Sequence, residues 1–215
     1  MEVSIIIPIK NEPYINSLVK QIRDLMKDFN YEIIIVDKSD ITPTINGAKI
    51  IKQKTDGLGN AILEGVKHSK GNVIITMDGD GSHRPVDIAR ILKKIKNYDI
   101  VIGSRFVKGG RSLDKSHRKL ISLIFRKLCS FILQLDVEDV LSGFAGIKKE
   151  VFQNIELNPL GYKFLMETMY KSKGKYKIYE MPIIFRSRKG GKSKANVKEA
   201  FNIIRYAIEL RMGLR

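Results

Sequence analysis

The sequence has a single cysteine, no tryptophan and no uninterrupted hydrophobic run of membrane-spanning length. Cys129 alone cannot form a disulfide framework or a thiolate metal cluster, so we expect a reducing, cytoplasmic setting. The longest hydrophobic segment, 120–135, is interrupted by Arg126 and Lys127 and falls short of the roughly 20 apolar residues that cross a bilayer. Residues 1–8 lack the pattern of a signal peptide. We therefore expect any membrane contact to be peripheral, on the cytoplasmic face.

Acidic residues are scarce. The 215 residues include 23 Asp and Glu against 39 Lys and Arg, giving a formal net charge of +16. Such a charge implies an anionic partner, which could be nucleic acid, an acidic membrane surface or a phosphate-rich substrate. The basic clusters show little of the interleaving with aromatic residues that stacking on nucleic-acid bases requires. We therefore expect no nucleic acid, although a basic nucleic-acid-binding protein remains the alternative from another class.

Apolar runs of strand length alternate with amphipathic stretches of helical period. The runs show no polar alternation, which is typical of parallel strands that helices cover on both faces. This rhythm predicts one α/β domain, Rossmann-like, with a mainly parallel central sheet flanked by helices. The expected strands are 3–9, 31–36, 48–52, 72–76 and 98–103, and the expected helices are 13–28, 58–69 and 85–95.

Two carboxylates, Asp78 and Asp80, follow the apolar run 72–76 directly, with Gly79 between them. Polar residues also follow the other expected strands, and the carboxyl ends of parallel strands are where such sheets bind ligands. Carboxylate oxygens suit a hard divalent cation such as Mg²⁺, which often keeps phosphate oxygens as further ligands. An isolated Asp-Gly-Asp is otherwise typical of a turn, but its place among these strand ends favours a cation site.

The chain changes character at about residue 105. Basic residues concentrate between 105 and 127 and again between 186 and 198, and residues 118–135 and 197–212 place apolar residues at helical spacing beside basic ones. Both helical segments suit either core packing or an interfacial position against anionic headgroups. Within a single domain 1–215, we expect two halves, 1–104 and 105–194, and a C-terminal amphipathic helix (195–215).

A series of segments resembles, in order, the motifs of family 2 glycosyltransferases, in particular those of the dolichol-phosphate mannosyltransferase branch. The resemblance covers residues 3 to about 194, and it implies that 1–104 is a nucleotide-sugar-binding half and 105–194 an acceptor-binding half. It implies a fold of the GT-A type and an inverting hexosyltransferase that moves mannose from GDP-mannose onto dolichyl or polyprenyl phosphate, or alternatively glucose from UDP-glucose. The segments are IPIKNE (7–12), VDKS (36–39), DGLGNAILEG (56–65), MDGDGSHRP (77–85), GSRFVKGG (103–110), SGFAG (142–146), FLMETM (164–169) and FRSRKGGKSK (185–194).

The resemblance also implies where the donor and a Mg²⁺ or Mn²⁺ ion bind. Asp80 would be the principal metal ligand, Asp78 would contact both ion and donor, and Ser82 stands where some relatives place a third ligand. Asn11 and Glu12 could instead simply start a helix, and the glycines at 57 and 59 could serve helix entry alone. The donor-binding residues implied are Pro8, Asn11, Glu12, Asp37, Gly57, Gly59, Asp78, Asp80, Arg188, Ser193 and Lys194.

Arg105 and Arg118 resemble the two arginines that grip the acceptor phosphate in this branch, and a guanidinium suits that role because it is planar and permanently charged. A solvated basic face is the alternative for both. Asp139 and Glu167 resemble acids near the sugar and acceptor. A phosphate acceptor is already anionic, so it needs no strong base. The expected catalytic residues are Asp80, Arg105, Arg118, Asp139 and Glu167.

The sequence departs from the family pattern at two positions. Lys38 stands where relatives usually carry an acid, and Asp56 stands where they often carry a basic residue. Lys38 weakens any inference about the nucleotide base. The expected partners are the nucleotide sugar, the lipid phosphate and the membrane surface. Many relatives have membrane helices after the catalytic domain, which leaves three alternatives open: a peripheral protein, a partnership with a membrane-anchoring subunit, or a piece of a longer protein. A nucleotidyltransferase is disfavoured because IPIKNE lacks a glycine- and arginine-rich loop.

Overall fold

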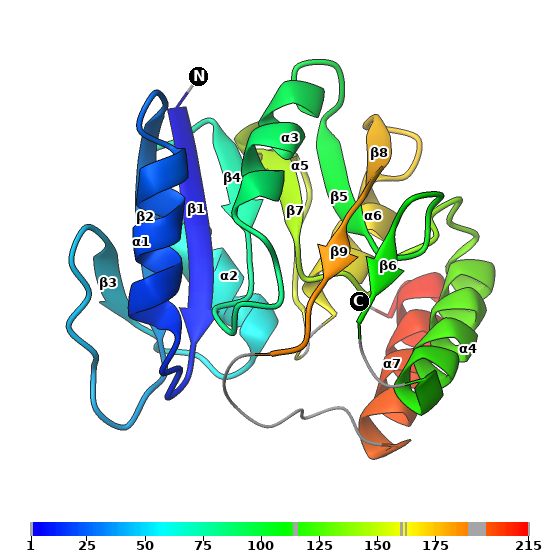
Figure 1. Ribbon diagram of the computed structural model, residues 1–215. Coiled ribbons are helices and arrows are strands. Elements are labelled where there is room, and N and C mark those ends of the chain that lie inside the picture. Colours follow the sequence, from blue (N-terminus) through cyan, green and yellow to red (C-terminus); the bar gives the residue numbers. More distant parts are fainter. Residues whose placement is uncertain (1, 114–115, 160, 162, 189–196, 215) are drawn as a thin grey trace.

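Seven strands form one mixed sheet in the computed structural model of the protein, in the order β3-β2-β1-β4-β7-β5-β8 (Figure 1). The structure describes residues 2–113, 116–159, 161, 163–188 and 197–214, and for 116–123 and 197–200 it describes the backbone alone. The sheet strands are β1 (Glu2–Ile9), β2 (Asn30–Asp37), β3 (Lys49–Lys52), β4 (Val73–Thr76), β5 (Ile100–Ser104), β7 (Ala145–Lys148) and β8 (Ile178–Pro182). A separate pair consists of β6 (Arg111–Ser112) and β9 (Ile184–Phe185).

The sheet is parallel except at β7. Strand β1 pairs in parallel with β2 and β4, β2 with β3, and β5 with β8, whereas β7 runs antiparallel to both β4 and β5. The prediction of a mainly parallel α/β sheet is therefore confirmed. Strand β7 was not expected. It comes from the predicted second half of the chain and lies between β4 and β5 of the first half, so strands from both halves share one sheet.

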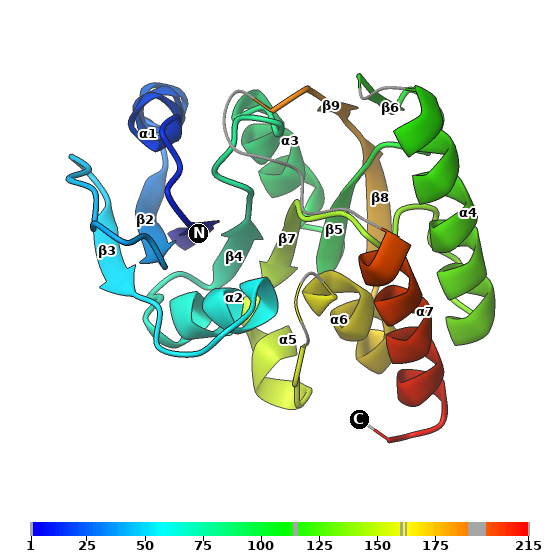
Figure 2. The same cartoon turned by 90° about the horizontal axis from the view of Figure 1, so that it is seen from below.

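Helices cover both faces of the sheet (Figure 2). Alternate strand residues point to opposite faces, so Ile5 and Ile7 of β1 enter the core under α1 and α3, while Ile6 enters the core under α2 and α6. This two-sided burial explains why the strands read as uninterrupted apolar runs. The helices are α1 (Ile15–Leu25), α2 (Leu58–Lys67), α3 (Val86–Lys94), α4 (Ser116–Leu133), α5 (Lys149–Asn154), α6 (Phe164–Ser172) and α7 (Val197–Arg211).

Helices α4 and α7 pack against each other at the β8 end of the molecule (Figures 1 and 2). Their inner sides are core, as Cys129 and Tyr206 are buried. Their outer sides expose large apolar residues, and the Phe131 side chain is 80% exposed. The exposed apolar residues of α4, α7 and the residues after α7 are Ile124, Leu128, Phe131, Phe201, Ile208, Met212 and Leu214.

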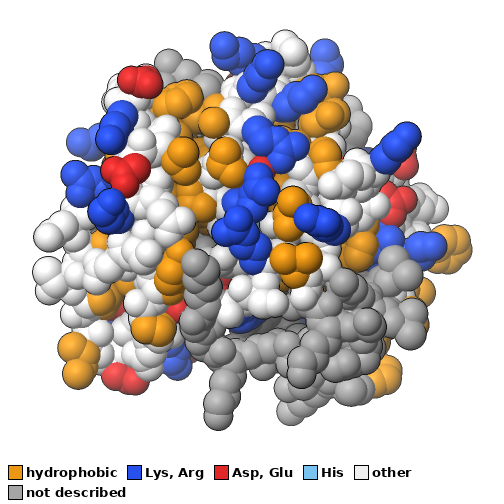
Figure 3. Space-filling model, in the orientation of Figure 1, with side chains coloured by type: hydrophobic (Ala, Val, Ile, Leu, Met, Phe, Trp, Pro, Cys, Tyr) orange, Lys and Arg blue, Asp and Glu red, His pale blue; other side chains and the backbone are white. Residues whose placement is uncertain are grey.

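The helices that the structure describes include none with the length and apolar character needed to cross a bilayer. Basic side chains are prominent on the face that α1 and α3 cover (Figure 3). On α3, Lys93 is exposed, and Arg90 and Arg84 both contact the buried Asp87. The high positive charge of the chain is thus carried partly by a face away from the α4 and α7 pair.

Candidate active site

The polar residues predicted at the strand ends meet at one edge of the sheet. Ile9 of β1 pairs with Asp37 of β2, and the parallel strands β4 and β5 end at the same edge. Because β7 is antiparallel, it begins where β4 ends, with Thr76 opposite Ala145. The unexpected strand therefore delivers Ser142 and Gly143 of the SGFAG segment to this edge.

The acidic segment after β4 lies at this edge with its two carboxylates differently exposed. The Asp78 side chain is 30% exposed, whereas that of Asp80 is 8% exposed. Asp80 Oδ1 accepts the backbone N–H of Ser82 at 3.0 Å, which fixes the loop. A Cβ on Gly143 would lie 3.1 Å from both Asp78 carboxylate oxygens, so the glycine leaves room beside this acid.

His83 supports the acidic segment from within the core. Its ring stacks on Phe144 and meets Phe185 edge-on, with centroid distances of 5.0 and 5.2 Å. Burial lowers the pKa of His83 despite the nearby carboxylates, so the ring is neutral, and Nδ1 accepts the backbone N–H of Asp78 at 3.3 Å. The hydrogen on the ring therefore lies on Nε2, and His83 orients Asp78 through its backbone.

Arg188 crosses over the acids from the segment that follows β9. Its Nε lies 3.1 Å from Asp80 Oδ2, and the backbone N–H of Arg186 donates to the Ser82 carbonyl at 2.9 Å. The segment that carries the predicted donor-binding residues 188, 193 and 194 thus begins against the acidic pair. Ser193 and Lys194, predicted for the same role, lie outside the described residues.

Glu12 adds a third carboxylate to this neighbourhood. Burial raises the pKa of Glu12, the charges of Asp80 and Asp78 act in the same direction, and its Oε1 is buried without a hydrogen-bond partner. Ser82 Oγ is likewise buried and without a partner. Such oxygens suit a hard cation. Within the described part of the chain, no three or more His, Cys, Asp or Glu side chains form a ready metal cage.

The loops after β1 and β2 are tied together beside these acids. The Asn11 backbone N–H donates to Ser39 Oγ at 2.8 Å, and its side chain exchanges hydrogen bonds with Asp40. Asp37 is fully buried: Oδ1 accepts the Ser39 N–H and Oδ2 lies 3.2 Å from Lys52 Nζ. Burial acts to raise the pKa of Asp37, but these bonds outweigh it and lower the pKa. Asp37 anchors the loop in this structure.

A small, mostly apolar pocket lies beside Asp78. Pro8 and Gly143 line it together with Leu58, Ile62, Phe164 and Leu165 from α2 and α6. Gly57 adopts φ +96°, a conformation that favours glycine, at the start of α2. The Gly59 N–H donates to the Gly161 carbonyl at 2.8 Å. The Gly59 amide thus holds a neighbouring loop in this structure, and its donor role stays a prediction.

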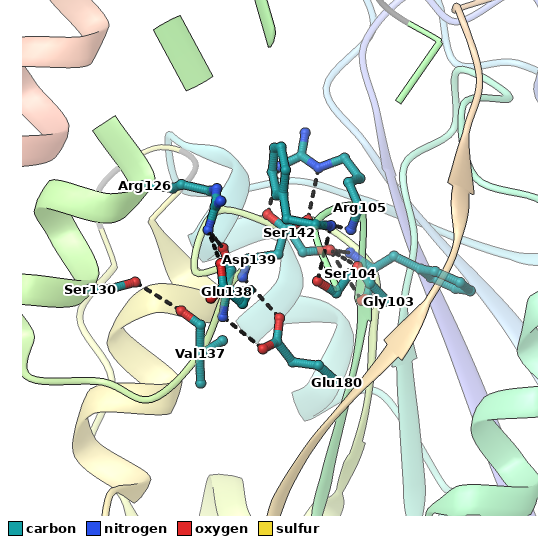
Figure 4. A network of polar contacts seen from close by, with 12 residues as sticks. Gly103, Ser104, Arg105, Arg126, Ser130, Val137, Glu138, Asp139, Ser142 and Glu180 are labelled. Carbon is teal, nitrogen blue, oxygen red and sulfur yellow. Dashed lines mark hydrogen bonds and ion pairs between the residues drawn. The ribbon is translucent and has the colours of Figure 1, made fainter. Parts of the chain in front are cut away.

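Arg105 is held at the end of β5 by Asp139 (Figure 4). Its Nε and Nη2 donate to the two Asp139 oxygens at 2.8 and 2.7 Å, and its backbone N–H donates to Oδ2 at 2.9 Å. Asp139 is fully buried and the Arg105 side chain is 15% exposed. The structure brings these two predicted residues together as a bidentate ion pair, in which Asp139 positions the Arg105 guanidinium.

Arg105 and the acidic segment share Phe185 as a neighbour. The Arg105 guanidinium lies 5.3 Å from the centre of the Phe185 ring, whose edge also meets His83. The charges of Asp78, Asp80, Arg105 and Asp139 all act on the titration of His83. The predicted cation site and the predicted phosphate-binding arginine are therefore parts of one site.

Glu167, predicted to be catalytic, lies in α6 and contacts α7. It is fully buried in α6, where Oε1 accepts the Asn158 N–H at 3.0 Å and Oε2 accepts the Tyr206 hydroxyl at 2.7 Å. Lys171 Nζ lies 2.9 Å from Oε1. Both oxygens are engaged in holding α7 and the loop before α6 in this structure, and the catalytic role of Glu167 stays a prediction.

Comparison with known proteins places this site in a family. The model of the family described as "Glycosyl transferase family 2" matches residues 4–156. The chain belongs to glycosyl transferase family 2. The predicted family is thereby confirmed, and the nucleic-acid-binding alternative is left without support.

Curated relatives of this family 2 chain include a "Dolichol-phosphate mannosyltransferase" of Pyrococcus furiosus, 38% identical over 98% of this chain. An "Undecaprenyl-phosphate mannosyltransferase" of Micrococcus luteus is 34% identical over 74% of this chain and 71% of the relative. The chain spans 64% of the length of the Pyrococcus protein.

Among solved structures, glucosyl-3-phosphoglycerate synthase from Mycobacterium tuberculosis, in complex with Mn²⁺, UDP-glucose and phosphoglyceric acid, superposes with a TM-score of 0.75. It is 16% identical, and the match covers 98% of this chain and 79% of that one. This likeness concerns the fold, and it confirms the predicted GT-A-type architecture.

One predicted site residue has a side chain that the structure does not describe, and two residues close to the site were not predicted from the sequence. Arg118 lies in α4, but its side chain is outside the described residues. Glu180 and Arg126 were not predicted as site residues, because Glu180 stands in no motif and Arg126 reads as a charge within an apolar helix. Arg126 is nevertheless buried, and its guanidinium stacks 4.2 Å from the Phe106 ring centre.

Proposed function

We propose that the chain is an inverting hexosyltransferase that moves mannose from GDP-mannose onto dolichyl or polyprenyl phosphate, giving a lipid-phosphate sugar. The observation that carries the proposal is the close association of an acidic pair, Asp78 and Asp80, with a clamped arginine, Arg105, at one sheet edge. The acids suit a cation-bound diphosphate, and the guanidinium suits a phosphate acceptor.

The donor half of the site would hold the nucleotide sugar. Asp80, Asp78 and Ser82 offer hard oxygens to Mg²⁺ or Mn²⁺, and the Mycobacterium tuberculosis neighbour is crystallised with Mn²⁺. When bound, such an ion supplies charge stabilisation for the departing diphosphate. Arg188, now paired with Asp80, can move its positive charge onto the diphosphate, while Pro8 and the joined loops of Asn11 and Asp37 would hold the base or ribose.

The acceptor half would orient a phosphate monoester by Arg105. An acceptor phosphate oxygen attacks the anomeric carbon, a new bond forms between that carbon and the oxygen, and the bond from carbon to the nucleotide diphosphate breaks. The phosphate is already anionic, so no proton has to be removed by a base. This agrees with the engagement of Asp139 by Arg105 and of Glu167 by Tyr206.

The polyprenyl chain of the acceptor would remain in a membrane. The exposed apolar outer sides of α4 and α7, flanked by exposed Lys127 and Arg211, suit peripheral binding to anionic headgroups. The single buried cysteine suits the cytoplasmic face, where thiols stay reduced. A membrane-anchoring subunit is compatible with the same surface and stays part of the proposal.

UDP-glucose is the second candidate donor, because Lys38 replaces the acid usual in the family and forms an ion pair with Asp56 at 3.0 Å. The test incubates the protein with polyprenyl phosphate, Mn²⁺ and either GDP-[¹⁴C]mannose or UDP-[¹⁴C]glucose, and counts the organic phase. We expect label from GDP-mannose, at least about tenfold above that from UDP-glucose, since each tenfold preference needs only ~1.4 kcal/mol of differential binding. Equal transfer, or preference for UDP-glucose, contradicts the donor assignment.

A further inference from the structure

Glu180 of β8 lies next to the loop that carries Asp139, the residue that holds Arg105 (Figure 4). Its Oε2 accepts the backbone N–H of Glu138 at 2.7 Å, and its Oε1 accepts that of Asp139 at 2.9 Å. The Ser104 hydroxyl makes a further hydrogen bond to the same carboxylate. Glu180 is half-buried and acts only as an acceptor here, so both of its oxygens are used to hold one short loop.

Side chains of α4 hold the same loop by hydrogen bonds from the opposite side. The Arg126 guanidinium donates to the carbonyl and to the carboxylate of Glu138. Ser130 Oγ donates to the Val137 carbonyl at 2.9 Å. Residues 137–139 are therefore fixed between β8 and α4, and the loop can offer the Asp139 carboxylate to Arg105 in one orientation only.

We propose that Glu180 is a positioning residue for the acceptor phosphate: it fixes Asp139, and Asp139 in turn fixes the plane of the Arg105 guanidinium that the phosphate meets. The inference rests on the proposed function, because it assumes that Arg105 meets an acceptor phosphate. Glu180 touches neither the donor nor the reacting atoms, and its effect passes through two hydrogen-bonded contacts.

A carboxylate is needed at position 180 because two successive backbone N–H groups point at it. Glutamine would keep one carbonyl oxygen but would turn an NH₂ group toward the other N–H, and two donors cannot bond. Burial and the nearby charge of Asp139 raise the pKa of Glu180, and the amide and hydroxyl donors that point at the carboxylate act against this rise. A residue that served β8 alone would not require this arrangement.

Asp99 offers a matched control on the same pair of strands. It precedes β5, accepts the Lys177 backbone N–H at 2.8 Å before β8 and lies 2.7 Å from Lys148 Nζ. It therefore has the same kinds of partner as the Glu180 and Asp139 pair, but at the opposite end of the strands from the site. A purely structural role for these carboxylates predicts similar effects of Glu180→Gln and Asp99→Asn.

The experiment measures steady-state transfer with polyprenyl phosphate and GDP-mannose as the varied substrates. We expect Glu180→Gln to raise the KM for the lipid phosphate about tenfold, the loss typical of a misplaced charged hydrogen bond, with the KM for the donor changed less than about twofold. Asp99→Asn should leave both values as in the wild type. Equal rises in the two KM values for Glu180→Gln, or no rise in either, overturn the proposal.

A readout independent of activity separates this inference from the proposed function. In protein labelled with [¹⁵N]arginine, the Nε–H resonance of Arg105, assigned with Arg105→Lys, reports the bond to Asp139. We expect Glu180→Gln to shift this resonance and Asp99→Asn to leave it in place. If the wild type transfers nothing, the proposed function fails, while a shift still supports the positioning of Arg105 and an unmoved resonance refutes it. Should Glu180→Gln fail to fold, Ser104→Ala serves as the milder variant for the same readouts.

Discussion

Asp80→Asn is expected to lower metal-dependent transfer about a thousandfold, equivalent to ~4 kcal/mol of transition-state stabilisation. The change keeps the size of the side chain and the oxygen that accepts the Ser82 N–H. It replaces the other oxygen, Oδ2, which now faces Arg188 and which we assign to the cation. The measurement is the rate of lipid labelling as Mn²⁺ is titrated, with thermal unfolding to establish that the variant is folded.

Asp24→Asn is the charge-matched control for this variant. Asp24 is an exposed residue of α1 that pairs only with lysines of its own helical neighbourhood, so its loss changes the net charge equally without touching the site. Its transfer rate should stay within about twofold of the wild type, as is usual for surface changes. Retention of more than about a tenth of the activity by Asp80→Asn would remove Asp80 from the metal site, because loss of a charged metal ligand costs more than that factor.

Arg105→Lys should lower kcat/KM for the lipid phosphate by about a hundredfold or more, because an ammonium cannot hold a carboxylate and a phosphate with a planar set of donors. The guanidinium uses Nε and Nη2 on Asp139, and a single Nζ cannot replace both bonds. Lysine keeps the positive charge, so the buried Asp139 is not left without a cation. We expect the donor KM to remain near the wild-type value, measured at saturating lipid phosphate.

Arg90→Lys is the corresponding control. Arg90 forms a close ion pair with buried Asp87 on α3, so the substitution disturbs a similar pair on another face of the molecule. It should lower stability without changing the acceptor KM. If Arg105→Lys and Arg90→Lys have the same kinetic effect, Arg105 serves the fold alone and the acceptor assignment is wrong.

The strands that could be predicted are those whose residues form uninterrupted apolar runs. The runs 3–9, 31–36 and 72–76 became β1, β2 and β4 within one residue at each end, because both faces of these strands are buried. Strand β7 was missed because its four residues include Gly146, which reads as a break. The glycine is required by packing instead: a Cβ there would lie 2.2 Å from Ile91 Cγ2.

The position of the site could be predicted, but the pairing of its charges could not. Parallel strands bring their carboxyl ends together, so residues such as Asp78 and Arg105 could be assigned to one edge from their place after a strand. The ion pair of Arg105 with Asp139 spans 34 residues, and the bond from the Tyr206 hydroxyl to Glu167 spans 39. No periodicity in the sequence encodes such contacts, so the partners of these two acids, both predicted to be catalytic, could not be predicted.

The central claim, that the protein transfers a sugar onto a lipid phosphate, is tested most directly by the choice of acceptor. Purified protein with Mn²⁺ and GDP-[¹⁴C]mannose should be offered polyprenyl phosphate, the same polyprenol without its phosphate, and 3-phosphoglycerate, with product separated by solvent extraction and thin-layer chromatography. The account predicts labelled product with polyprenyl phosphate alone, as an acid-labile lipid. Labelling of the free alcohol or of 3-phosphoglycerate, with none of polyprenyl phosphate, would contradict it.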